Sequence, residues 1–278
     1  GLAAAFNTPL AGVVFAIEEL GRGTAVRWDR LVMSAVLGAG FIALSVFGNN
    51  SYFHLNESIL ALNAAWWIVL VCALVNGVLG GLFGKMLLAG PAAWLPASQR
   101  SWSERHPVLL AAVCGLLVAL LGILAQGTTY GTGYEQAAAL LNGHPVDSML
   151  FGLSKLGATI LSYFAGIPGG IFTPSLAIGA GIGDNIAQLL PGAVDGRLIA
   201  LLSMAAFLAA ATQAPITASV IVMEMTRSQD VTLLLLATTL AASLVSRQFC
   251  PRPFYHAASR NFRREALHKH RMSRTTES

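Results

Sequence analysis

Charged residues are scarce in this chain. Only 11% of its 278 residues are Asp, Glu, Lys or Arg, against roughly 25% in a typical soluble domain. Hydrophobic residues make up 55% of the sequence. A soluble domain of this size would expose too much apolar surface, so the composition excludes an ordinary soluble protein and predicts a polytopic membrane protein.

Residues and motifs typical of enzymes and metalloproteins are also sparse. Cys72, Cys114 and Cys250 are scattered and odd in number, which argues against a disulfide framework or a zinc site. The six histidines show no ligand spacing, and the sequence contains no phosphate-binding loop, nucleophile elbow or nucleotide fingerprint. An intramembrane enzyme using Glu18 or Glu19 as general base would lack any accompanying nucleophile or cofactor motif. We therefore expect no enzyme activity, no metal and no cofactor.

What the chain does contain is a series of long apolar runs. Each reaches or approaches the ~20 residues that a helix needs to cross a bilayer. We expect an all-α protein whose helices are joined by polar linkers near residues 48–62, 91–107, 126–147 and 191–197. The runs are Leu31–Phe47, Ala64–Leu82, Val108–Ala125, Met149–Ala165, Leu198–Ala211 and Val231–Val245.

The two ends of the chain differ in character. It opens on GLAAAFNTPL, without Met or a signal peptide, and we interpret it as a fragment whose upstream part is missing. Basic residues crowd the other end, which predicts a cytoplasmic C-terminus by the positive-inside rule. Nucleic-acid binding is the alternative for these charges, but no aromatic or motif pattern accompanies them. We predict a membrane domain over residues 1–258 and a basic cytoplasmic tail over residues 259–278.

An internal repeat links two distant segments. Residues 4–19 read AAFNTPLAGVVFAIEE and residues 210–225 read AATQAPITASVIVMEM. Each has a proline followed nine positions later by glutamate, Glu18 in one copy and Glu224 in the other. The apolar runs after the prolines are too short to cross a bilayer, so they are predicted to be partial helices that begin on proline. Such repeats suggest the inverted halves of a transporter.

The glutamates of this repeat are candidates for two different roles. Because Glu18 and Glu224 share a position, they are expected to share a structural task, such as holding a helix end. Glu19 matches Met225 and is therefore the better candidate for a proton-carrying carboxylate, since ionisable groups within membrane segments tend to be functional. The alternative is a solvated helix end, with the carboxylates paired to Arg22 or Arg27.

Two further segments could bind an anion. The segment GIPGGIFTP, residues 166–174, breaks the backbone at membrane depth, which is tolerated where it lines a cavity. Pro174 is suited to start the next helix, so the amides of Gly170, Ile171, Phe172 and Thr173 would face that cavity at a helix N-terminus, where an anion is stabilised. A glycine hinge is the alternative. The hydroxyl of Tyr255, in CPRPFYHAAS, could donate to an anion at the cytoplasmic mouth.

Together, LAAAFNTPLAGVVFAIEEL, GIPGGIFTP, APITASVIVMEMT and RPFY resemble, in this order, the CLC family of chloride channels and chloride/proton antiporters. The resemblance implies a CLC-type inverted-repeat helical fold and a homodimer with one ion pathway per subunit. It implies that the amides of Ile171 and Phe172 and the hydroxyl of Tyr255 contact chloride. It places Glu19 at the inner proton-transfer carboxylate, which channel members generally replace by an apolar residue.

The resemblance also has gaps. The family's first chloride loop with its serine, and its G-[KR]-E-G-P segment with the outer gating glutamate, are absent from these residues. We therefore expect the C-terminal portion of a chloride/proton antiporter of the bacterial inner membrane, with chloride and other small anions, protons, lipid and a second subunit as partners, and no nucleic acid. A passive chloride channel is the alternative, and an intramembrane enzyme or an inactive fragment the remote ones.

Overall fold

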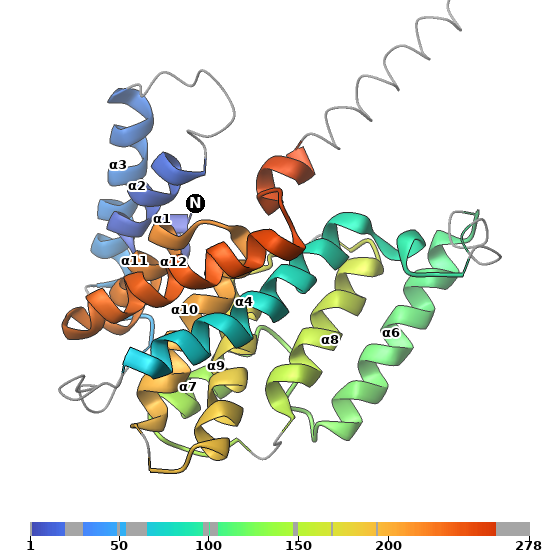
Figure 1. Ribbon diagram of the computed structural model, residues 1–278. Coiled ribbons are helices and arrows are strands. Elements are labelled where there is room, and N and C mark those ends of the chain that lie inside the picture. Colours follow the sequence, from blue (N-terminus) through green and yellow to red (C-terminus); the bar gives the residue numbers. More distant parts are fainter. Residues whose placement is uncertain are drawn as a thin grey trace, which may run out of the picture.

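The computed structural model describes residues 2–19, 30–48, 51–53, 66–96, 100, 105–146, 150–167, 169–192 and 194–259. Within these residues the chain is helical and has no strand, as the sequence predicts (Figure 1). Of the basic tail predicted for 259–278, the described residues include Ser259 alone. Arg22 and Arg27 also lie outside the described residues.

The helices follow the predicted apolar runs closely. Their bounds are α1 Leu2–Ala5, α2 Pro9–Glu18, α3 Arg30–Phe47, α4 Trp66–Ala89, η2 Pro91–Ala93, α6 Pro107–Leu124, α7 Tyr134–Leu141, α8 Phe151–Phe164, α9 Phe172–Leu189, α10 Gly196–Thr212, α11 Pro215–Thr226, η3 Gln229–Val231 and α12 Thr232–Phe249. All six predicted runs form helices, and within the described residues three segments are long and apolar enough to cross a membrane: α4, α6 and the stretch Gln229–Phe249.

One predicted linker is wrong in part. The sequence between 126 and 147 was expected to be a polar connection, yet α7 forms within it. Gly133 begins this helix in the left-handed region, with φ of 82°, which glycine adopts without a steric penalty. Ala137, Leu140 and Leu141 then lie on one buried face, and α7 packs against α9. This apolar face, rather than local polarity, decides the structure of the segment.

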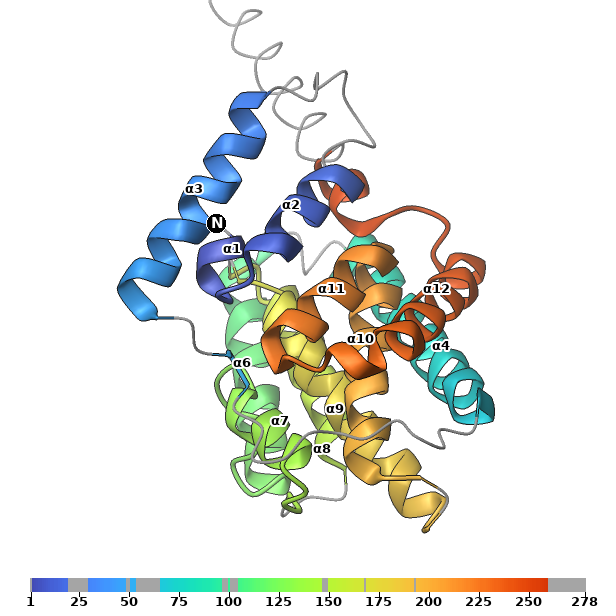
Figure 2. The ribbon, with the colours of Figure 1, turned by 90° about the vertical axis from the view of Figure 1, so that its left-hand side faces the viewer.

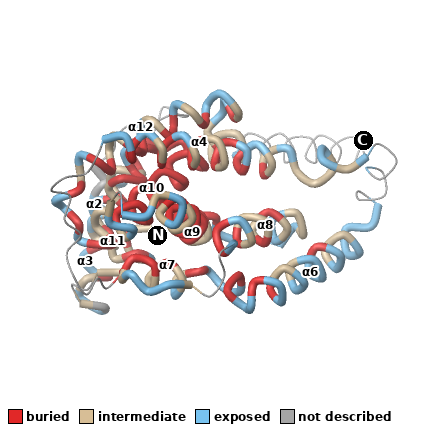
Figure 3. The backbone as a smooth tube through the Cα atoms, turned by 60° about the horizontal axis from the view of Figure 1, so that its bottom comes forward, coloured by how far each residue is buried: buried red, intermediate tan, exposed pale blue. Residues whose placement is uncertain are grey.

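Helix α10 forms the centre of the protein. Every residue from Leu198 to Thr212 is buried, and α4, α9, α11 and α12 surround the helix. Figure 3 shows this centre as a dense region of buried backbone, whereas α6 lies at the periphery beside α8. Small residues make such burial possible, because they let neighbouring helix backbones approach closely inside a membrane.

The glycines of α9 are essential to this close approach. A Cβ atom added at Gly179 would lie 2.5 Å from the carbonyl oxygen of Ser203 and 2.7 Å from the Cα of Met204, both in the backbone of α10. Gly179→Ala should therefore lower the free energy of unfolding by about 1–3 kcal/mol through overpacking. Thermal unfolding of the purified full-length protein in detergent, monitored by size-exclusion chromatography, measures the effect.

Gly115→Ala is the matched control for this substitution. Gly115 lies inside α6, and a Cβ added there meets nothing within 4 Å. Because alanine favours helix by roughly 1 kcal/mol over glycine, this variant should be as stable as the parent or more so. Equal midpoints for Gly179→Ala and the parent would contradict the close packing of α9 on α10.

Helices α4 and α12 run side by side (Figures 1 and 2). Gly77 of α4 lies against Val245, and Gly81 lies against Ser246 of α12. On another face of α4, Gly80 lies against Ala210 of α10. The repeated glycines of NGVLGGLFG thus let one helix pack closely against two others.

The short helices α2 and α11 form an antiparallel pair beside α3 and α12. Each begins on a proline, Pro9 or Pro215, as the repeat predicts. Proline suits this position because its missing N–H would have no partner within the helix and its φ is already helical. The pair brings together two segments about 200 residues apart in the sequence and positions the residues described next.

Candidate functional site

Two glutamates link the antiparallel helices α2 and α11, one at each end of the pair. The Glu18 carboxylate, in the last turn of α2, accepts hydrogen bonds at the start of α11 from the amide of Ile216 at 3.3 Å and from the amide of Thr217 at 2.7 Å. The Thr217 hydroxyl donates a third bond to it at 2.8 Å. Reciprocally, the Glu224 carboxylate of α11 accepts bonds at the start of α2 from the amides of Leu10 at 3.1 Å and Ala11 at 2.7 Å.

The proline at the start of each helix explains this arrangement. Proline has no backbone N–H to donate, so the first available amides belong to the two residues that follow it. These are the amides that the glutamates bind. The preceding residues, Thr8 and Ala214, make no side-chain cap. A carboxylate at a helix N-terminus also interacts favourably with the helix dipole. The expectation that Glu18 and Glu224 hold helix ends is therefore confirmed; we call these contacts the crossed caps.

Glu19 follows Glu18 directly and is also buried, with 7% of its surface exposed. Its amide donates to the carbonyl of Phe15 at 2.9 Å and so completes the last turn of α2. A solvated helix end, the alternative left open by the sequence, does not fit this burial. Because Glu18 is engaged by α11, the end of α2 is fixed, and Glu19 is fixed with it.

The predicted anion loop leads into α9. The helix begins at Phe172 with Ile171 as its N-cap, two residues before the start expected at Pro174, which becomes its third residue. The first N–H groups of a helix have no partner within it, and Pro174 donates none, so the free amides belong to the preceding residues. Ile171 has a buried side chain, whereas Gly170 is exposed. The backbone therefore offers amide donors at an accessible helix N-terminus.

Aromatic rings connect this loop to the other predicted residues. Phe172 stacks on Tyr255, with ring centroids 5.8 Å apart and an interplanar angle of 23°. Phe15 of α2 meets both rings edge-on, at 5.8 Å from Phe172 and 6.1 Å from Tyr255. The Glu19 carboxylate lies close enough to Tyr255 to interact with it electrostatically. The structure thus brings Glu19, Phe172 and Tyr255 to one junction, centred on the ring of Phe15.

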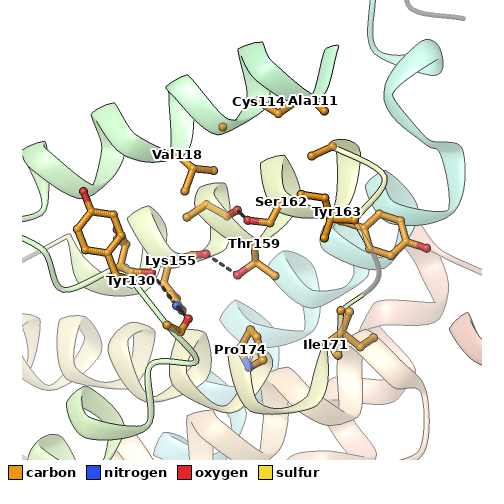
Figure 4. Close-up of a pocket in the computed structure, with 18 residues that line it drawn as sticks. Ala111, Cys114, Val118, Tyr130, Lys155, Thr159, Ser162, Tyr163, Ile171 and Pro174 are labelled. Carbon is orange, nitrogen blue, oxygen red and sulfur yellow. Dashed lines mark hydrogen bonds between the residues drawn. The ribbon is translucent and has the colours of Figure 1, made fainter. Parts of the chain in front are cut away.

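The other side of the loop faces an open pocket of about 450 Å³ between α6 and α8 (Figure 4). Gly170, Ile171 and Pro174 contribute to its wall. Lys155 of α8 also lines it and is 3% exposed. Its ammonium donates to the carbonyls of Thr129 and Gly131, both at 2.7 Å. The two carbonyl dipoles thus stabilise the buried charge, and the lysine links the loop before α7 to α8.

Sequence analysis missed Lys155 and Phe15. Lys155 is the only charged residue in the apolar run Met149–Ala165, and an ionisable residue inside a membrane segment is a recognised signal of function or of a specific partner. Phe15 gave no such signal, because one aromatic residue in an apolar helix looks like ordinary core. Only the fold shows that it bridges α2, α9 and the Tyr255 segment.

The chain matches a known protein family over most of its length. The family described as voltage gated chloride channel matches residues 1–247. The chain is 30% identical over 269 residues to the H(+)/Cl(-) exchange transporter ClcA of Klebsiella pneumoniae (strain 342) and 28% identical over 271 residues to ClcA of Yersinia pestis. Each match covers 92% of this chain and 55% of the relative. The chain therefore spans about half the length of these curated relatives.

Solved structures show the same fold. A slow cyanobacterial Cl-/H+ antiporter superposes with a TM-score of 0.71 at 25% identity, over 94% of this chain and 62% of that structure. A CLC-type fluoride/proton antiporter superposes with a TM-score of 0.74 at 23% identity, over 92% of this chain and 62% of that one. The family match extends over most of the sequence and includes both halves of the crossed caps. The chain therefore belongs to the voltage gated chloride channel family and has the CLC-type helical fold.

Proposed function

We propose that the protein is a chloride/proton antiporter and that this chain supplies its inner proton carboxylate and part of its chloride site. The observation that carries the proposal is the buried Glu19 carboxylate, which lies within electrostatic range of Tyr255. A passive chloride channel needs an anion path but no such carboxylate. The curated relatives named above are H(+)/Cl(-) exchange transporters, which supports the same choice.

Chloride would bind through backbone amides and one hydroxyl. The amides of Gly170, Ile171 and Phe172, at the start of α9, would donate to the anion with help from the positive end of the helix dipole, and Tyr255 would donate its hydroxyl. Such donors bind a dehydrated anion without a full positive charge, so the anion can also leave. The stacking of Phe172 on Tyr255 holds two of these donors in fixed relation.

The membrane setting forms part of the proposal. Basic residues Lys85, Arg247 and Arg252 lie near the C-terminal ends of α4 and α12, which favours a cytoplasmic position for these ends by the positive-inside rule. The protein would then be a multi-pass protein of the inner membrane with a cytoplasmic C-terminus. A homodimer is proposed from the family resemblance.

Chloride-driven proton movement tests the proposal. The full-length protein is reconstituted in liposomes with an outward chloride gradient and no proton gradient. The proposal expects outward chloride flow to drive protons inward, which a pH-sensitive dye in the lumen records. Chloride flow without proton movement would establish a channel and overturn the proposal.

Tyr255→Phe should weaken chloride binding. The substitution removes the hydroxyl donor and keeps the ring that stacks on Phe172, so the junction should remain intact. Because a hydrogen bond to a charged group contributes roughly 1.5–3 kcal/mol, we expect at least a roughly tenfold rise in the chloride dissociation constant measured by calorimetry. Tyr130→Phe, at an exposed tyrosine, is the control, and equal affinities for Tyr255→Phe and the parent would refute the assignment.

A further inference from the structure

A second pocket lies where two of the longest apolar helices end. Its volume is about 440 Å³, and the last turn of α4 and the segment after α12 form its wall. Gly84 of α4 lies against Cys250, the first residue after α12, so the two helix ends meet there. Because both helices are long and apolar enough to cross a membrane, their ends, and the pocket between them, belong at the membrane surface.

The lining of this pocket combines positive charge with apolar surface. Among the described residues that line it, Lys85, Arg252 and His256 are basic and none is acidic. Leu88 and Phe249 are among the apolar ones. Neither Lys85 nor Arg252 forms an ion pair within the described part of the chain, and both are exposed. Their charges are therefore available to an anionic partner.

We propose that this pocket binds the phosphate headgroup of an anionic phospholipid. Basic pockets at the ends of membrane helices attract such headgroups. The basic groups would bind the phosphate, while the apolar side chains would contact the glycerol and the start of the acyl chains. This occupant fits the mixed lining better than free phosphate, which would leave the apolar part of the pocket in contact with water.

The helix dipole alone does not account for these charges. A basic residue in the last turn of a helix stabilises the negative end of its dipole, but Lys85 precedes the last turn of α4. Arg252 and His256 lie beyond the end of α12, in a segment that lines the pocket. The three basic groups therefore converge on the cavity from two separate parts of the chain.

An occupant of this pocket would contact the segment that carries Tyr255. Cys250 begins this segment, and two hydrogen bonds from its backbone groups hold Cys250 in place. Its amide donates to the carbonyl of Ser246 at 2.9 Å, and its carbonyl accepts from the Gln213 side chain. His256 and Ala257 line the pocket directly after Tyr255. Lipid binding would thus add contacts to the part of the segment that follows Tyr255. An effect on chloride affinity is a consequence that rests on the proposed function, whereas lipid binding itself does not.

Native mass spectrometry of the purified full-length protein tests the proposal, with phosphatidylglycerol as the probe and phosphatidylcholine as the neutral comparison. We expect phosphatidylglycerol to bind more tightly than phosphatidylcholine. Lys85→Gln and Arg252→Gln should each weaken phosphatidylglycerol binding roughly fivefold, as expected for one basic group near a membrane surface. Arg252→Lys keeps the charge and should bind within about twofold of the parent.

Arg247→Gln is the matched control, because Arg247 is an exposed basic residue in the last turn of α12 that does not line the pocket. An equal loss in this variant would show general charge attraction and overturn the site. Equal binding of the two lipids would also overturn it. Displacement of the lipid by inorganic phosphate at equal concentration would identify a free-phosphate site instead. Because no transport is measured, failure here leaves the antiport proposal standing.

Discussion

Glu19→Gln in the full-length protein is expected to abolish chloride-driven uphill proton movement and to leave chloride flow down its gradient. Glutamine has nearly the same shape as glutamate but cannot take up and release a proton. Glu19 is buried at the end of α2, and because burying a carboxylate in a membrane protein is costly, such a residue is a candidate for a functional group. Its removal should therefore affect protons selectively, with proton flux falling to the level of empty liposomes.

The geometry explains why chloride should be spared. Glu19 lies near Tyr255, but the proposed anion donors are the amides that precede α9 and the tyrosine hydroxyl. Phe15, rather than Glu19, supports the rings of Phe172 and Tyr255. An isosteric change at Glu19 leaves these contacts in place. The two proposed ion pathways thus meet at this junction, but Glu19 is not one of the proposed chloride donors.

Glu135→Gln provides the control for this experiment. Glu135 lies in the first turn of α7 and is exposed, so the same chemical change there should leave both fluxes at the parent level. Paired flux measurements on the parent and the two variants separate the outcomes. Proton movement that persists in Glu19→Gln would exclude this residue from the proton path, while loss of both fluxes would indicate damage to the anion site.

The sequence predicts local features of this fold better than it predicts their meeting points. Each of the six apolar runs forms a helix, because uninterrupted hydrophobicity is a strong signal in a membrane protein, whereas α9 was expected only from the proline that follows the glycine-rich segment. The repeat predicted that Glu18 and Glu224 share a structural role, because they occupy the same position in its two copies. It could not say which groups they bind, since the partner helix is about 200 residues away.

The junction around Phe15 shows where the sequence falls short. Glu19, Phe172 and Tyr255 come from three distant segments, and no residue spacing records that they meet. The resemblance to a family could point to these residues, but the ring of Phe15 between them follows only from the packing of α2 against the start of α9. Lys155 is different, because a single charge in an apolar run was visible and was overlooked.

Removal of the crossed caps should lower the free energy of unfolding more than the substitution Gly179→Ala. Glu18→Ala deletes three hydrogen bonds to a carboxylate and leaves the amides at the start of α11 without an acceptor. Hydrogen bonds to charged groups contribute roughly 1.5–3 kcal/mol each, and the ordinary loss of an N-cap costs about 1 kcal/mol. The sum of three such bonds is an upper limit, because water can replace part of them, and the loss of an ordinary cap is a lower one, so we expect the free energy of unfolding to fall by on the order of 3 kcal/mol. Glu224→Ala, with two bonds instead of three, should cost less, about 2 kcal/mol, between the same two limits.

Equilibrium unfolding of the full-length protein in mixed micelles measures these losses, and Glu135→Ala is the exposed control. Thr217→Val isolates one bond of the Glu18 cap, because it replaces the hydroxyl by a methyl group of similar size and keeps the backbone amide. Its cost should largely disappear in the Glu18→Ala background, where the acceptor is already absent. Equal costs in both backgrounds would show that the hydroxyl and the carboxylate do not interact.

The double variant Glu18→Ala/Glu224→Ala tests whether the caps act separately. Nine residues of α-helix separate the two ends by about 14 Å, and effects at that distance usually add within about 0.5 kcal/mol. Near-additive costs are therefore expected, since each glutamate holds a different end of the α2–α11 pair. A double variant no less stable than Glu18→Ala would mean that one cap already fixes both ends. The distinction matters for transport, because only Glu18 holds the end of α2 that carries Glu19.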